Sequence, residues 1–332
     1  MFQICHHNCV LSNCSDVDAF RARQPWPESA LRWSCDEECR YNCMWSTINH
    51  YRLNRSQLVQ FHGKWPFRRW LGMQEPASVI FSLLNLVAFH YMTVMLLKNT
   101  HSDAPLRRVW LGYSILCTFT WLWSAVFHAR DTPLTERMDY FCAFACVLYK
   151  LFAAVLRLSY PRQNKVQAVL TGPVLGFFAY HVWYLSSVKF DYGYNMTVNI
   201  VAGMLSVTLW LAFCVQQIRV NQRGAQVWRC AFVVIVANLL FSLEALDFAP
   251  FWSTFDAHSL WHAGTAVLPL FWAQFLIDDV AYLYADVKHQ QSSHHAANGA
   301  VVEKKKPKKN GANESNGVTK RVTRSQRNGV VR

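Results

Sequence analysis

Charged residues are scarce in this chain. Asp, Glu, Lys and Arg make up 16% of its 332 residues, whereas 52% are hydrophobic; an ordinary soluble domain carries about 25% charged residues. The apolar residues are also gathered into long blocks instead of being spread at amphipathic spacing. This composition argues against an ordinary soluble domain, and the blocks predict membrane helices.

A hydrophobic leader is also lacking, since the chain starts MFQICHHNC, without a continuous apolar run. Six of the eleven cysteines nevertheless precede residue 44, namely Cys5, Cys9, Cys14, Cys35, Cys39 and Cys43. An even, dense set of this kind predicts disulfides in an oxidising compartment. Because such a domain has to be translocated, we expect a cleaved leader or upstream segment. The pairing stays open, and structural zinc is the alternative, weakened by i, i+4 spacing in place of CxxC pairs.

Seven apolar blocks are long enough to span about 30 Å of hydrocarbon, which takes about 20 helical residues. Only helices and closed barrels satisfy their backbone groups in lipid, so each block is predicted to be a helix. The expected spans are Pro76–Leu97, Val109–Phe127, Asp139–Arg157, Val166–Val188, Thr197–Ile218, Trp228–Asp247 and Ser259–Tyr284. The predicted fold is therefore an all-α polytopic membrane protein.

The loops predict the orientation. Those after the first, third and fifth spans hold nine Lys and Arg residues, whereas those after the second, fourth and sixth hold three. Positive loops favour the cytosolic side, so the N-terminus is expected to be luminal and the C-terminus cytosolic. The net charge of +13 does not indicate nucleic-acid binding, because eleven of the 33 Lys and Arg residues lie after the last span.

These observations predict three regions: a cysteine-rich luminal domain (1–75), a seven-helix domain (76–285) and a disordered basic cytosolic tail (286–332). The tail is rich in Lys, Asn, Gly and Ser, with few large apolar residues. Contact between this tail and anionic lipid is an alternative role. The sequons at Asn13 and Asn54 are consistent with glycosylation in the lumen.

Five polar residues occupy the ends of three apolar blocks, where polar groups are costly and usually functional. Ser124 and His128 are four residues apart and share a helix face, as do His258 and His262. A short loop joins the second and third spans as antiparallel neighbours, which brings Asp139 level with His128. The topology places all five at one luminal level.

Three imidazoles with one open position are typical of catalytic zinc, which lowers the pKa of its water to about 7. The glutamate of an HExxH motif is absent after His258, so Asp139 is the expected base and Ser124 the expected holder of the water or the oxyanion. Each residue also has an ordinary alternative: an interfacial histidine, a serine bonded to its own backbone, or an aspartate cap.

The arrangement S-x3-H, Asp and H-x3-H resembles the CREST superfamily of membrane hydrolases. Within it, the chain resembles the post-GPI-attachment-to-proteins factor three, or Per-like, family of GPI-anchor phospholipases, over about Cys5 to Tyr284. The resemblance rests on Cys35–Trp45, Phe61–Phe67, Gln74–Ser78, Trp123–Asp131, Met138–Cys142, Phe190–Asn195 and Leu246–Phe248.

The resemblance implies zinc ligands at His128, His258 and His262, with Ser124 and Asp139 beside the water. It implies removal of the unsaturated sn-2 acyl chain from the phosphatidylinositol of GPI-anchored proteins, in the Golgi membrane or, for fungal members, the endoplasmic reticulum. A ceramidase of the same superfamily, a lipid receptor without turnover and a transporter are the alternatives.

Further polar residues receive weaker predictions. His181, Glu244, Asp247, Asp191 and Asn195 could contact the substrate headgroup or glycan, or could serve only in interhelical bonds and loop order. Lys150 is expected to snorkel toward the cytosolic end. Asp278 and Asp279 are expected to be structural.

Overall fold

The computed structural model describes residues 1–53, 59–220 and 224–304. Over these ranges the regular secondary structure is helical, with three isolated bridges and no strand, and seven helical segments are long and apolar enough to cross a membrane. The prediction of an all-α polytopic membrane protein is confirmed. Residues Met1–Ala285 form one compact unit, and a second unit begins at Asp286.

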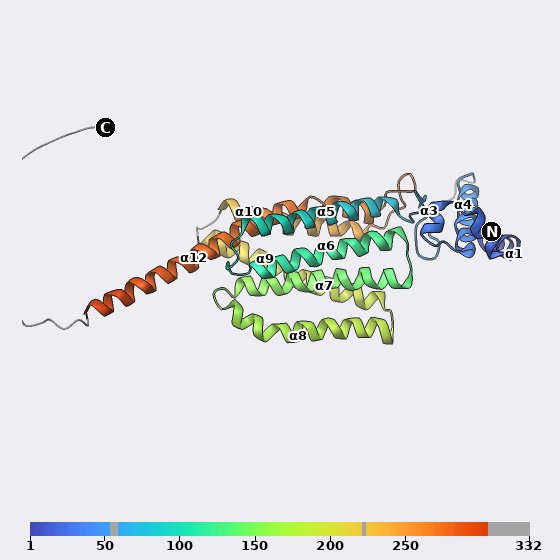
Figure 1. Cartoon of the computed structure of the whole chain (residues 1–332). Coiled ribbons are helices and arrows are strands. Elements are labelled where there is room, and N and C mark those ends of the chain that lie inside the picture. The colour runs from blue at the N-terminus through green and yellow to red at the C-terminus, as the bar shows by residue number, and fades with distance from the viewer. Residues whose placement is uncertain (54–58, 221–223, 305–332) are drawn as a thin grey trace, which may run out of the picture. The chain divides into compact units, whose positions relative to one another are not determined.

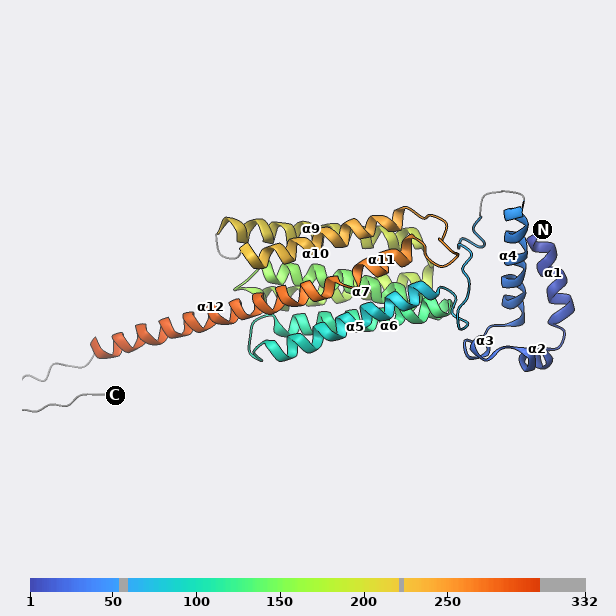
Figure 2. The same ribbon diagram turned by 90° about the horizontal axis from the view of Figure 1, so that it is seen from above.

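Contacts between neighbouring helices place six membrane segments in a closed ring in the order α5, α6, α7, α9, α10 and α11, with α8 packed on α7. Figures 1 and 2 show these helices running side by side, and in Figure 1 α8 lies at the edge of the bundle next to α7. The last segment consists of α11 followed by α12. The helices are α5 (Pro76–Asn99), α6 (Arg107–Ala129), α7 (Pro133–Leu158), α8 (Gln163–Trp183), the π-turn η1 (Tyr184–Val188), α9 (Tyr192–Arg219), α10 (Gly224–Phe241), the 3₁₀ turn η2 (Ser242–Ala245), α11 (Ala257–Thr265) and α12 (Leu268–Lys304).

Local sequence determines where the helices at the site begin. Pro76 opens α5 and Pro133 opens α7, at the position where a missing N–H is tolerated. Thr132 forms a reciprocal capping box with Thr135 before α7, and Asp256 forms one with Ser259 before α11. These starts place Asp139 in the second turn of α7 and the two α11 histidines in its first two turns.

The last membrane segment differs from its prediction in two ways. It is divided at Ala266 and Val267, because Pro269 in the first turn of α12 has no N–H to donate back to the preceding turn. Helix α12 also continues to Lys304, although we expected disorder from residue 286. The residues from Ala285 to Ala297 contain neither Gly nor Pro, so nothing local ends the helix there. Residues 305–332 lie outside the described ranges.

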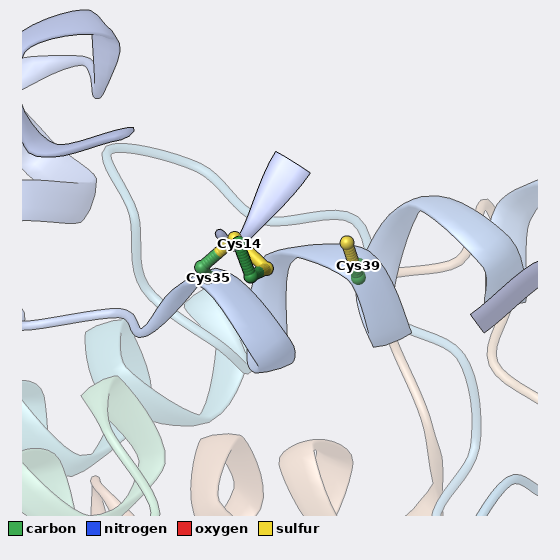
Figure 3. Close-up of side chains that lie close together, drawn as sticks. All are labelled: Cys14, Cys35 and Cys39. Carbon is green, nitrogen blue, oxygen red and sulfur yellow. A yellow bond between two sulfur atoms is a disulfide. The ribbon is translucent and has the colours of Figure 1, made fainter. Parts of the chain in front are cut away.

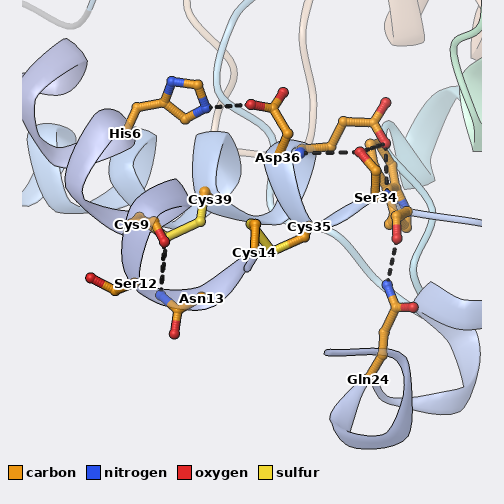
Figure 4. Close-up of a disulfide and its surroundings, with 12 residues drawn as sticks. His6, Cys9, Ser12, Asn13, Cys14, Gln24, Ser34, Cys35, Asp36 and Cys39 are labelled. Carbon is orange, nitrogen blue, oxygen red and sulfur yellow. Dashed lines mark hydrogen bonds and ion pairs between the residues drawn. A yellow bond between two sulfur atoms is a disulfide. The ribbon is translucent and has the colours of Figure 1, made fainter. Parts of the chain in front are cut away.

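Helices α1 (Phe2–Asn13) and α4 (Cys35–Leu53) lie antiparallel and are joined by three nested disulfides, with α2 (Val17–Arg23) and α3 (Trp26–Ala30) between them in the chain. The bridges are Cys5–Cys43, Cys9–Cys39 and Cys14–Cys35. Figure 3 shows Cys39 next to the Cys14–Cys35 bridge, and Figure 4 shows the last two bridges as neighbouring rungs together with a bond between His6 and Asp36. The predicted disulfide framework is confirmed, and no sulfur of this set is left to hold zinc.

One-turn spacing explains the ladder, because cysteines four residues apart on one helix project from the same face. Of the two sequons, Asn54 lies outside the described residues. Asn13 ends α1, is exposed, and donates its side-chain amide to the Cys9 carbonyl at 3.1 Å (Figure 4). Glycosylation at Asn13 stays a prediction.

Trp33 links this N-terminal region to the helical bundle. Its indole N–H donates to the Gly72 carbonyl at 2.9 Å, and its ring lies between the guanidinium groups of Arg69 and Arg130, at 3.4 and 3.9 Å from the ring centroid. Gly72 has a φ of +73°, and a Cβ there would meet the Pro27 backbone at 2.8 Å, so only glycine fits. The packing supports the α6–α7 loop directly.

Candidate metal centre

The three predicted histidines converge at one end of the bundle. His128 is the penultimate residue of α6, while His258 and His262 lie one turn apart on α11. One ring nitrogen from each lies within 4.8 Å of the others, and His258 Nε2 is 3.3 Å from His128 Nε2. His128 and His262 are buried, and His258 is half-buried. Chain segments 130 residues apart thus form one cluster.

The opposite nitrogen of each histidine has a polar partner. His128 Nδ1 lies 2.7 Å from Glu75 Oε2, and His258 Nδ1 lies 2.7 Å from Glu244 Oε2. His262 Nδ1 lies 2.9 Å from Ser82 Oγ. Partners of this kind orient metal-binding imidazoles and raise their basicity.

The tautomers follow from the acceptors. An ionised carboxylate only accepts hydrogen bonds, so His128 and His258 carry their protons on Nδ1. Their Nε2 atoms lie 3.3 Å apart, and neither atom is used in the bond to the carboxylate, so both are available to a shared cation. Three imidazole nitrogens with oriented outer partners fit zinc with an open fourth position.

Glu75 lies just before α5 in a dense electrostatic environment. Burial alone would raise its pKa, but His128 and Lys64 outweigh burial and lower the pKa of Glu75 to about 2. Burial likewise opposes the charge on Lys64, yet Glu75 and Asp131 raise the pKa of Lys64 above its usual value. Glu75 is therefore an anion that accepts a hydrogen bond from His128 through one oxygen and forms an ion pair with Lys64 through the other, at 3.6 Å.

Ser124 and Asp139 lie beside the histidines. Ser124 is buried one turn before His128, with its Oγ 3.2 Å from Ser82 Oγ. Asp139 interacts with both Ser124 and His128. The structure thus brings together all five residues of the predicted cluster, while their catalytic roles stay predictions.

Two cavities of about 260 and 450 Å³ open from the cluster into the bundle, and Asp139 and His258 line both. Their walls are largely apolar. The larger cavity lies among α7, α9, α10 and α11 and is bordered by the exposed side chains of Ile200, Met204 and Phe241. It therefore reaches the outer surface of the bundle, where lipid would lie.

Comparison with known proteins identifies the family. A model of the Per1-like family matches residues 25–280. A Xenopus tropicalis protein named GPI-specific phospholipase A2-like PGAP3 is 41% identical over 289 residues, 85% of this chain and 89% of the relative. The Danio rerio protein of that name is 37% identical, covering 85% and 89%. Drosophila melanogaster post-GPI attachment to proteins factor 3 is 36% identical, covering 80% and 83%.

The chain belongs to the Per1-like family. The expected family membership is thereby confirmed. The five residues that received weaker predictions lie in different surroundings.

Glu244 and Asn195 line the larger cavity, and Glu244 also orients His258. Asp247 instead accepts from Gln60 at 2.9 Å and from the Trp65 indole at 2.7 Å. Asp191 caps α9 by accepting from the Tyr194 N–H at 3.0 Å. His181 is fully buried, with its ring centroid 4.1 Å from that of Phe144, and lines neither cavity.

The prediction that Lys150 snorkels toward the cytosolic end is wrong. Its ammonium lies 5.5 Å from the centroid of the Trp272 ring, and its side chain lines both cavities. Eleven residues separate it from Asp139, or about 16 Å along the helix. Trp272 supplies an aromatic face at that depth, so the side chain turns into the bundle instead of snorkelling.

Sequence reasoning missed Glu75 and Ser82 as partners of the histidines, and it predicted a headgroup contact for Glu244 instead of its bond to His258. Glu75 precedes a predicted span, where charged residues are ordinary, and Ser82 is a single hydroxyl in an apolar helix. A signal was nevertheless present: Ser78, Ser82 and Asn85 fall on one face of α5 at spacings of four and three. Asn85 Nδ2 donates to the His262 carbonyl at 2.8 Å, so this polar face is directed at α11.

Proposed function

We propose that this chain is a zinc-dependent acyl ester hydrolase that removes the sn-2 fatty acid from the phosphatidylinositol of GPI-anchored proteins. The observation that carries the proposal is a cluster of three oriented histidines opening onto apolar cavities within a membrane bundle. The relatives' names, which include GPI-specific phospholipase A2-like, support the substrate class.

His128, His258 and His262 would hold the zinc, while Glu75, Glu244 and Ser82 fix the ring orientations. Zinc with three protein ligands supplies an open position and lowers the pKa of water to about 7. The Asp139 carboxylate would take the proton of the attacking water, since it lies in the cavity wall beside His258. The Ser124 hydroxyl would donate to the oxygen of the ester carbonyl.

The cavities would receive the acyl chain. Their apolar walls match an alkyl chain, and the border at Ile200, Met204 and Phe241 offers entry from the lipid side. Such a chain would place its ester at the polar end of the cavity, where Asp139 and the histidines lie. The apolar lining along the rest of the wall would exclude water and so strengthen electrostatic interactions at the cluster.

We place the histidine end on the luminal side of the Golgi membrane, with the endoplasmic reticulum as the alternative. The three disulfides of the N-terminal region form in oxidising compartments. The predicted distribution of loop charges supports the same orientation. GPI-anchored proteins reside on that face of the membrane, so enzyme and substrate would share one leaflet.

A rescue assay tests the proposal. Wild type and Asp139→Asn are expressed at matched levels in cells that lack GPI sn-2 deacylation, and mass spectrometry reads the lipid on a GPI-anchored reporter. We expect wild type alone to restore the deacylated form, because Asn accepts a proton poorly. Equal restoration by both proteins would remove Asp139 from the mechanism. Failure of correctly folded wild type would favour a lipid receptor or a ceramidase.

A further inference from the structure

A third cavity lies outside the membrane helices. It has a volume of about 300 Å³ and is bordered by α1, α4, the segment from Phe61 to Gln74 and the start of the α6–α7 loop. Aromatic and charged side chains alternate around it, among them Phe2, Tyr41, Phe61, Trp65, Arg40 and Lys64. This lining differs from that of the two apolar cavities, so we expect a different kind of ligand.

The third cavity lies two side chains away from the histidine cluster. Lys64 is part of its wall, and Lys64 Nζ is 3.6 Å from Glu75 Oε1. The other oxygen of Glu75 lies 2.7 Å from His128 Nδ1. Backbone bonds from the Gln74 N–H to Ala129 and from the Glu75 N–H to His128, both 3.0 Å, hold these walls in register. A molecule that spans both places would have one part at the metal centre and another in this cavity.

A tight turn presents two residues of the wall. Phe61 and Lys64 exchange backbone hydrogen bonds at 2.7 and 3.1 Å. His62 and Gly63 between them have φ values of 53° and 79°, as a two-residue turn of type I′ requires. The disulfide ladder and the Trp33 stack stiffen the rest of the border. The cavity is therefore largely formed before any ligand binds, which lowers the entropic cost of binding.

The charges of the wall are balanced. Each cation pairs with a carboxylate, namely Arg40 with Asp36, Arg69 with Glu38, Arg130 with Glu37 and Lys64 with Asp131. A multiply charged anion gains little in such surroundings. A polyhydroxylated ligand fits better, because ion-paired groups still offer donors and acceptors to hydroxyls while aromatic rings pack against the C–H faces of sugars.

We propose that this cavity binds the glycan of the substrate headgroup and so selects glycan-bearing phosphatidylinositol over the plain lipid. The inference rests on the proposed hydrolase function, since the same molecule would place its ester among the histidines. The glycan leaves the membrane next to the ester, on the side where the disulfide-linked helices stand above the bundle.

Phe61→Ala removes one aromatic wall, and Met44→Trp fills the cavity from α4. The matched control is Trp26→Ala, since Trp26 is an aromatic residue of the same N-terminal region, 78% exposed and outside the lining. Full-length proteins in lipid nanodiscs are compared on a GPI lipid and on plain phosphatidylinositol. We expect both cavity variants to lower the ratio of the two kcat/KM values by about tenfold, with plain-lipid hydrolysis unchanged. A ratio unchanged in both variants overturns the proposal.

A binding experiment separates this proposal from the hydrolase function. The probe is the soluble glycan-inositol phosphate released from a GPI-anchored protein by phosphatidylinositol-specific phospholipase C and proteolysis. We expect wild type and His258→Ala to bind it equally, and Phe61→Ala and Met44→Trp to bind it about tenfold more weakly. If wild type hydrolyses neither lipid, the proposed hydrolase function is wrong, but the binding measurement still tests whether this cavity binds the glycan. Absence of binding by wild type overturns the glycan site.

Discussion

At one end of the helical bundle, buried charges satisfy one another completely. Arg157 of α7 donates two hydrogen bonds to Asp279 of α12, at 2.6 and 2.8 Å, and both side chains are buried. Arg229 pairs with Asp278 at 2.7 Å nearby. Large aromatic side chains, including Trp210 and Phe275, fill the space around them. Asp278 and Asp279 thus have structural partners, as expected.

At the histidine end, each imidazole has a carboxylate or hydroxyl partner on only one of its two ring nitrogens. His128, His258 and His262 each bind an outer partner through Nδ1, and their other nitrogens face a common point beside two cavities. Both ends carry ionisable groups in a membrane bundle, yet only one leaves bonding capacity directed at open space. Completed networks stabilise a fold, whereas half-completed networks beside a cavity indicate chemistry.

Loss of a histidine at the open end should have the largest effect. His258→Ala removes one of the three proposed zinc ligands. Loss of an outer partner typically lowers metal affinity or activity by up to about 100-fold, so we expect the turnover of this variant to fall by more than that. The fold should survive, because His258 is only half-buried. Hydrolysis of a GPI lipid by the purified protein and its zinc content provide the readouts.

His181→Phe is the matched control, since His181 is a buried histidine that packs on Phe144 and lines neither cavity. It should retain zinc and activity. Equal losses in the two variants would mean that any buried histidine is needed for folding, and the contrast between the two ends would collapse.

At the paired end, Arg157→Ala should act on stability instead of activity. It removes the guanidinium partner of the buried Asp279 carboxylate, and breaking a buried ion pair by removing one partner typically costs about 3–5 kcal/mol of unfolding free energy. Thermal unfolding in detergent measures the loss, and the activity per folded molecule should match wild type. Arg157→Met combined with Asp279→Leu should recover much of the stability, because neither partner is then left charged. A loss of activity without a loss of stability would contradict the assignment.

Glu75→Gln tests whether the outer partners tune the centre. Gln keeps the shape but removes the negative charge that orients His128, so zinc affinity or activity should fall by about 10–100-fold. Zinc titration with a competing chelator measures the affinity. Asp103→Asn, an exposed carboxylate in the α5–α6 loop at the opposite end, should have no effect; equal affinities in wild type and Glu75→Gln would show that the Glu75–His128 bond is dispensable.

Much of this architecture is readable from the chain. Seven apolar blocks predicted the seven spans, because a bilayer allows few other solutions. His128, Asp139, His258 and His262 stood out because ionisable groups are rare in apolar segments, and helical spacing plus a short loop sufficed to predict that they lie at one level. These inferences needed only local periodicity and topology.

The remainder depends on contacts between distant segments. Glu75 lies 53 residues from His128, and no local pattern distinguishes it from other polar residues near a membrane helix. Ser82 lies 180 residues from His262; its polar helix face can be read from the sequence, but the helix that this face contacts cannot. The residues around Pro269 are uniformly hydrophobic, so hydrophobicity predicted one continuous span and did not indicate the division at Ala266. The disulfide pairing needed the antiparallel packing of α1 and α4, which follows from tertiary structure alone.

Lys150 lies between the two ends, and Lys150→Met shows to which of them it belongs. The ammonium is buried against Trp272, where a cation–π contact contributes about 0.5–2 kcal/mol but a charge in hydrocarbon surroundings is more costly. We therefore expect thermal stability in detergent to rise by a few degrees, with hydrolysis of the GPI lipid kept within about tenfold of wild type, since one wall position of an apolar pocket contributes about 1–3 kcal/mol. Lys98→Met, at the exposed end of α5, is the control and should change neither quantity. A loss of stability would assign Lys150 to the paired end, as a group that Trp272 and its neighbours need. A gain in stability, with hydrolysis changed by no more than about tenfold, would assign it to the cavity wall at the open end.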